Sequence, residues 1–237
     1  MKQTVLFDLD GTIVEHGHAL LPTFLSKHGH DRSLDSVKMA VSRQIHYFYN
    51  HVAAAEEQDW IQELFRRFYS LILGDLEIAD PEHSLAHEIN DYFATHPVPP
   101  IFDDVLPLLL ALQAQKRRLG VITQRGREGA EHFLESHGLT SVFETLIAGD
   151  DGHGRKPGSG PFLAALNQLD SSPADAVYIG DRIDDDCEGA TGAGLDAFLI
   201  DRDRVYTLDA SERDDFVHLT DLGQLLLHLP PAISDNC

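Results

Sequence analysis

The stretch Phe7-Asp8-Leu9-Asp10-Gly11-Thr12 decides the fold of this 237-residue chain. Residues 4–9 form a short β-branched and apolar run, which predicts a buried strand. Side chains alternate along a strand, so Asp8 and Asp10 point to one side and Leu9 to the other. Ligands of open α/β sheets bind where strands end. An ordinary turn with solvated acids has the same composition, so the other strand ends must decide between the two interpretations.

Four further apolar runs predict strands, and helical patterns lie between the later ones. The strands are expected at 119–123, 145–148, 176–179 and 196–200, and the helices at 103–116, 127–137, 162–169 and 184–193. Alternating strands and helices predict a parallel sheet. The expected fold class is α/β, with a Rossmann-like parallel core.

The long stretch between the first and second strands interrupts this alternation. It shows helical periodicity, clearest in one apolar stripe at i, i+3, i+4 spacing formed by Ile61, Leu64, Phe65, Phe68 and Ile72. Pro97, Pro99 and Pro100 mark the return to the core. We therefore expect a helical domain at 15–100, inserted into a core built from 1–14 and 101–237.

The charge of the chain restricts its partners. With 39 acidic and 18 basic side chains the formal net charge is −21, which argues against nucleic acid or an anionic membrane as partner. A phosphorylated substrate would be repelled at long range, so its site must be locally positive. Two cysteines, no secretory signal and no long apolar run predict a cytoplasmic protein without a disulfide framework.

The ends of the second and third strands offer groups that bind phosphate. Thr123, Gln124 and Arg125 stand at a strand-to-helix junction, where a hydroxyl and free amides favour an anion, although a Thr there can also cap a helix. Lys156 precedes Pro157 and a helix, so it is expected to reach across the top of the sheet. Taken alone, an exposed loop lysine is the simpler interpretation.

The fourth strand ends at Gly180-Asp181 and is followed by Asp184, Asp185 and Asp186. Acids near a helix start are common because the helix dipole favours them. So many acids beside Asp8 and Asp10, however, would repel one another without a cation. Oxygen ligands suit Mg²⁺, so the sequence predicts a magnesium site.

In order along the chain, these four segments resemble the signature of the haloacid dehalogenase superfamily, phosphatase branch, with a helical cap. The resemblance covers residues 2–12 and about 101–200, and the insert matches the cap in position and character only. It implies that Asp8 attacks phosphorus and that Asp10 is the general acid and base. It further implies that Thr123 and Lys156 hold the phosphoryl group.

The same resemblance implies the remaining site residues. Mg²⁺ would be held by the Asp8 carboxylate, the Asp10 carbonyl and Asp181, with Asp186 orienting bound water. Asp185 also satisfies the spacing of that last acid, but the run that begins at Asp186 matches the family pattern better. Candidate phosphate or substrate contacts are Gly11, Thr12, Gln124, Arg125 and His18. Gln124 stands where many relatives have Asn.

The activity implied is Mg²⁺-dependent hydrolysis of a small phosphorylated metabolite through an aspartyl-phosphate. A sugar phosphomutase is an alternative on the same fold, and a phosphate-binding regulatory protein without catalysis is another. The sequence leaves open whether the chain is a monomer or a homodimer.

Overall fold

The computed structural model describes residues 2–52, 58–95, 98–202, 204, 206 and 213–229. The chain divides into two compact units, Met1–Val14 with Pro100–Cys237 and Glu15–Pro99. No helix in the described ranges is both long and apolar enough to cross a membrane.

The first unit is built on a six-stranded parallel sheet in the order β3-β2-β1-β4-β5-β6. The strands are β1 (Thr4–Phe7), β2 (Arg118–Ile122), β3 (Thr145–Ile147), β4 (Ala176–Gly180), β5 (Asp196–Ile200) and β6 (Phe216–Leu219). This confirms the predicted parallel α/β sheet and adds β6, which the sequence analysis missed. β1 lies between β2 and β4, where the strand order reverses, and this is the usual ligand site of such sheets.

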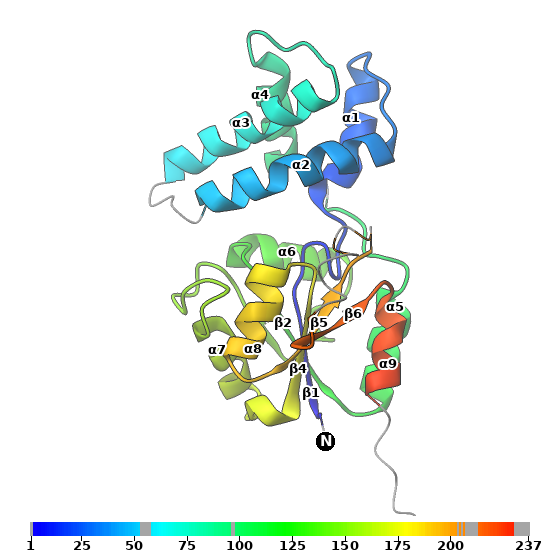
Figure 1. Ribbon diagram of the computed structural model, residues 1–237, viewed down its shortest axis with the longest axis vertical. Coiled ribbons are helices and arrows are strands. Elements are labelled where there is room, and N and C mark those ends of the chain that lie inside the picture. Colours follow the sequence, from blue (N-terminus) through cyan, green and yellow to red (C-terminus); the bar gives the residue numbers. More distant parts are fainter. Residues whose placement is uncertain are drawn as a thin grey trace, which may run out of the picture. The chain divides into compact units, whose positions relative to one another are not determined.

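Helices cover both faces of this sheet (Figure 1). They are α5 (Val105–Ala114), α6 (Arg127–Ser136), α7 (Gly160–Gln168), α8 (Gly189–Gly192) and α9 (Leu225–His228), with 3-10 turns at Pro173–Asp175 and Leu222–Gln224. Leu6 and Tyr178 from neighbouring strands share a buried cluster with Phe162 and Leu166 of α7. Because the central strands β1 and β4 are buried on both faces, their sequences are nearly continuous apolar runs.

The helix predicted at 184–193 begins differently from the expectation. Ile183–Glu188 forms a π-helical turn, in which the Cys187 N–H donates to the Arg182 carbonyl five residues back (3.2 Å), and α8 follows it. Such wide turns are rare and occur often at functional sites. Here the turn carries Asp186 into the protein interior, where its side chain is completely buried.

The second unit, Glu15–Pro99, is entirely helical among its described residues. It consists of a 3-10 turn at Gly17–Leu20 and the helices α1 (Leu21–Lys27), α2 (Leu34–Val52), α3 (Gln58–Asp75) and α4 (Ser84–Thr95). Leu64, Phe68 and Ile72 of the predicted stripe are buried in its core, and Phe65 packs against that core. Ile61, the first member of the stripe, lies outside the residues whose side chains are described.

The chain leaves and re-enters the first unit at adjacent points, which a half-buried arginine connects. Val14 bridges to Ile101, and the Phe102 N–H donates to the Ile13 carbonyl (3.1 Å). Arg202, just beyond β5, donates to Asp104 Oδ2 (2.7 Å) and to the Thr12 carbonyl (2.8 Å), and its guanidinium stacks on Phe102. Arg202 thus fastens the turn after Asp10 to the start of α5.

We expect Arg202→Met to lower the free energy of unfolding by about 1–3 kcal/mol, because it removes a charged hydrogen-bond donor from the partly buried Asp104 carboxylate, to which the Leu222 N–H still donates. Burial opposes ionisation of Asp104, but its hydrogen bonds from Arg202 and from the Leu222 N–H outweigh that and lower its pKa. Arg213→Met is the matched control, since Arg213 pairs with Glu188 and Asp215 in a more exposed position and should cost about 0–1 kcal/mol. Urea denaturation measures both, and equal losses would contradict a special role for Arg202.

Candidate active site

The site is built at the carboxyl ends of β1 and β4, which are neighbours. β1 ends at Phe7, so Asp8 is the first residue beyond it, and the Asp8 N–H donates to the Ile179 carbonyl of β4 (2.8 Å). Asp181 follows the last residue of β4 directly. The positions of these two acids are therefore fixed by strand pairing rather than by a loop.

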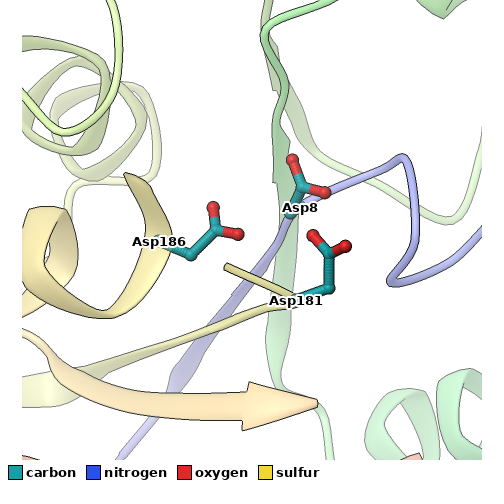
Figure 2. Close-up of side chains that lie close together, drawn as sticks. All are labelled: Asp8, Asp181 and Asp186. Carbon is teal, nitrogen blue, oxygen red and sulfur yellow. The ribbon is translucent and has the colours of Figure 1, made fainter. Parts of the chain in front are cut away.

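Three acids converge at this point (Figure 2). One carboxylate oxygen from each of Asp8, Asp181 and Asp186 lies within 4.8 Å of the other two. Asp8 is 6% exposed and Asp186 is 0% exposed, so little solvent screens their repulsion. Burial raises the pKa of Asp8 well above its ordinary value, and the neighbouring Asp186 and Asp181 raise it further against the opposing effect of Lys156.

Lys156 partly balances this charge. Its Nζ donates to Asp8 Oδ1 (2.6 Å), to Asp186 Oδ1 (2.5 Å) and to the Tyr178 hydroxyl (2.9 Å). Burial alone would lower the pKa of Lys156, but Asp186 and Asp8 raise it, so the side chain stays protonated. The interpretation of Lys156 as an exposed loop residue is wrong, since the side chain is buried.

The structure distinguishes Asp186 from Asp185. Asp186 Oδ2 accepts from the Arg182 N–H (3.0 Å), while its other oxygen faces Lys156. Asp185 is bound instead by the Arg182 side chain (3.0 Å). Gly180 makes room for Asp186, because a Cβ at that position would lie 2.2 Å from Asp186 Cγ. Of the two acids, Asp186 therefore joins the cluster.

Asp10 has a different partner. Arg125 Nε donates to Asp10 Oδ2 (3.2 Å), and Arg125 Nη2 donates to Asp10 Oδ1. The turn that carries Asp10 depends on Gly11, whose φ of 85° is in the left-handed region that glycine tolerates. The sequence analysis proposed Arg125 as a substrate contact, but it did not predict this pairing, which joins the ends of β1 and β2.

The end of β2 is ordered by hydrogen bonds to its neighbours. Thr123 is buried, and its hydroxyl accepts from the Arg125 N–H (3.1 Å). Gln124 Nε2 donates to the Lys156 carbonyl (3.0 Å), so it connects this loop to the lysine loop rather than reaching outward. Gly149 packs against Gln124, because a Cβ there would lie 2.3 Å from the Gln124 carbonyl oxygen.

Thr12 and His18 are the remaining candidate residues. Thr12 is completely buried, and its hydroxyl has no hydrogen-bond partner among the described residues. Its contact with phosphate stays a prediction. His18 lies in the helical unit, where burial, His16 and Lys38 lower its pKa so that the ring is neutral at pH 7. A substrate contact by His18 also stays a prediction.

The acid cluster fits a magnesium ion. The group offers oxygen ligands only, and two of its three carboxylates, those of Asp8 and Asp186, are bound by the same Lys156 ammonium. Mg²⁺ takes oxygen ligands and keeps several waters, so a site with few protein ligands suits it. Asp8 and Asp181, with the Asp10 carbonyl, are the groups proposed to hold it. Asp186 has both oxygens engaged by protein donors, which suits orientation of water instead.

The sequence analysis missed Tyr178, which lies inside β4 and contacts both Lys156 and Asp186. A signal was present, because a tyrosine in an otherwise apolar central strand must find a partner for its hydroxyl.

Comparison with known proteins agrees with this geometry. Residues 5–200 match the family described as haloacid dehalogenase-like hydrolase. The chain is 30% identical over 254 residues to a phosphoglycolate phosphatase from Rhodospirillum rubrum, covering 100% of this chain and 99% of the relative. It is 28% identical over 188 residues to the pyrophosphatase PpaX from Bacillus pumilus, covering 78% and 77%.

Among solved structures, the HAD-hydrolase YfnB from Bacillus subtilis, bound to magnesium, superimposes with a TM-score of 0.73 at 21% identity. The superposition covers 96% of this chain and 98% of that one, and it shows that the fold is shared. The family match over most of its length and the 30% identity to the phosphoglycolate phosphatase over the whole chain show that the chain belongs to the haloacid dehalogenase-like hydrolases.

Proposed function

We propose that the protein is a Mg²⁺-dependent phosphatase that hydrolyses a small phosphorylated metabolite through an aspartyl-phosphate on Asp8. The observation that carries the proposal is the position of Asp8: it directly follows the central strand β1, accepts a hydrogen bond from the buried Lys156, and lies beside Asp181 and Asp186. A carboxylate so placed can act as a nucleophile once its charge and that of the phosphate are balanced.

In the first step an Asp8 oxygen bonds to phosphorus, and the bond from phosphorus to the leaving oxygen breaks. Asp10 donates a proton to that oxygen, so the alcohol departs neutral. In the second step Asp10 takes a proton from water, whose oxygen attacks phosphorus and releases Asp8 and inorganic phosphate. Asp10 must exchange its bonds with Arg125 for each proton transfer, since Arg125 holds both of its oxygens.

The remaining groups bind and orient the phosphoryl group. Bound Mg²⁺, held by Asp8, Asp181 and the Asp10 carbonyl, would supply positive charge between the nucleophile and the phosphate. Thr123 directly follows β2 and Lys156 donates to Asp8, so the Thr123 hydroxyl and the Lys156 ammonium are proposed to contact phosphoryl oxygens, together with Gly11, Thr12, Gln124 and Arg125. This local positive charge would offset the repulsion that a phosphorylated substrate experiences from a protein with a net charge of −21.

The substrate class follows from the relatives and from the insert. The curated relatives described above are named as a phosphoglycolate phosphatase and a pyrophosphatase, which supports a phosphatase acting on small molecules here. We propose that the core binds the phosphoryl group and that residues of the helical unit, His18 among them, recognise the leaving group.

Hydrolysis of p-nitrophenyl phosphate by the purified protein tests the proposal. We expect turnover with millimolar Mg²⁺ and a loss of at least about 100-fold after EDTA treatment, restored by added Mg²⁺, because the acid cluster then regains its cation. Asp184→Asn is the matched control for removing one nearby acid, since the side chain of Asp184 is exposed and pairs with Arg182. Full activity after exhaustive chelation would contradict the metal requirement, and absence of turnover on a panel of phosphate monoesters would contradict the phosphatase.

A further inference from the structure

The hydroxyl of Tyr178 lies at the centre of the charged cluster although the residue belongs to the core. The side chain is completely buried, and its ring packs edge-on against Phe162 with centroids 4.9 Å apart. Its oxygen is 2.9 Å from Lys156 Nζ, 2.9 Å from Asp186 Oδ1 and 3.3 Å from the Ile122 carbonyl oxygen. A phenylalanine could make the ring packing, so the hydroxyl needs a separate explanation.

A count of donors and acceptors gives that explanation. A lysine ammonium has three N–H groups, and Lys156 directs them at Asp8, Asp186 and Tyr178. The tyrosine hydroxyl accepts from Lys156 and has one proton to donate, for which Asp186 Oδ1 is the nearer acceptor. Lys156, Asp186 and Tyr178 therefore form a closed triangle of hydrogen bonds.

The triangle is sealed from water. Lys156 is 6% exposed, and both Tyr178 and Asp186 are 0% exposed. Burial, Asp186 and Asp8 raise the pKa of Tyr178, so the hydroxyl keeps the proton that it donates. If the hydroxyl is removed, one N–H of Lys156 loses its acceptor and no solvent can replace it. The ammonium must then rotate toward the two carboxylates.

We propose that Tyr178 is a positioning residue, which fixes the direction of the Lys156 ammonium and hence its bond to Asp8. The inference rests on the proposed function, because the bond matters for turnover only if Asp8 is the nucleophile. Tyr178 does not touch the reacting atoms in this scheme. It acts through Lys156, whose third N–H it occupies while the other two hold the nucleophile and Asp186.

Tyr178→Phe tests the inference, because it removes the hydroxyl and keeps the ring. We expect kcat to fall about 10- to 100-fold, the effect of losing one hydrogen bond to a charged group, with KM changed less than about twofold. Phe162→Leu is the matched control, since it disturbs the same packing without touching the hydroxyl. It should lower the melting temperature and leave kcat near that of the unmodified protein.

Two kinetic results would overturn the inference. One is a Tyr178→Phe protein that melts lower but keeps its kcat, which would make the hydroxyl purely structural. The other is a lower KM with unchanged kcat, which would mean that Tyr178 competes with phosphate for Lys156.

Crystal structures of the metal-free protein and of Tyr178→Phe provide a readout that does not need activity. We expect Nζ of Lys156 to move from its position 2.6 Å from Asp8 Oδ1 in the variant. If the unmodified protein hydrolyses no phosphate ester, the proposed function fails while this comparison still tests the positioning of Lys156. An unmoved ammonium would contradict the inference even in an active enzyme.

Discussion

Asp8→Asn should abolish turnover, with a loss of at least about 10⁴-fold, which is the scale seen when a covalent nucleophile is removed. The amide has nearly the same shape as the carboxyl group, and its oxygen can still accept from Lys156. Its nitrogen and its weakly nucleophilic oxygen cannot form the acyl-phosphate. Burst and steady-state assays with p-nitrophenyl phosphate measure the loss.

The same variant should fold at least as stably as the unmodified protein when metal is absent. Burial, Asp186 and Asp181 raise the pKa of Asp8, so ionising this carboxyl at neutral pH opposes folding, and the uncharged amide relieves that cost. Asp184→Asn again serves as control, because it removes an exposed acid nearby and should keep activity. Retention of more than about 1% activity by Asp8→Asn would remove Asp8 from the role of nucleophile.

The strands of the sheet centre were predictable because they are buried on both faces. Continuous apolar runs result, and β1, β2, β4 and β5 were found from them to within two residues. β6 was not predicted from the sequence because it is an edge strand, paired with β5 alone in the described sheet, and its two middle residues, Val217 and His218, are partly exposed. Its four residues form neither a long apolar run nor a regular alternation.

The closeness of the acids in the site was predictable for a different reason. Asp8 and Asp181 each directly follow a strand, and the pairing of strands fixes where those strands end. Once β1 and β4 are neighbours, Asp8 and Asp181 must be close. The sequence favoured Asp186 over Asp185 as the third acid only because the residues that follow Asp186 match a family pattern. In the structure, the π-helical turn directs Asp186 into the site, while the Arg182 side chain binds Asp185.

Contacts between side chains of distant segments could not be predicted. The pairing of Arg125 with Asp10 and that of Arg202 with Asp104 depend on how far a flexible side chain reaches and on which acceptor lacks another donor. The sequence indicates that the Tyr178 hydroxyl needs a partner, because the residue lies in an apolar central strand. Only the structure shows that this partner is Lys156.

Lys156→Met should lower kcat/KM by about 10³-fold or more, the scale of losing one preorganised charge beside a transition state. It should also change how the protein responds to metal. The substitution leaves Asp8, Asp181 and Asp186 together without the ammonium that contacts two of them. Each unit charge at about 4 Å is worth about 4 kcal/mol at an effective dielectric constant near 20, so the metal-free protein should be destabilised.

Mg²⁺ should therefore raise the melting temperature of Lys156→Met more than that of the unmodified protein, since a more negative site binds the cation more tightly and binding stabilises the folded state. Arg155→Met is the matched control: Arg155 is the adjacent cation, it is exposed, and its bond to the Gln124 carbonyl is 3.5 Å long. That variant should keep both the activity and the Mg²⁺ response of the unmodified protein. Thermal unfolding with EDTA and with an excess of Mg²⁺ separates the outcomes. An equal Mg²⁺ shift in all three proteins would mean that the cation does not bind beside Lys156, because only a site next to the lost ammonium gains affinity when that charge is removed.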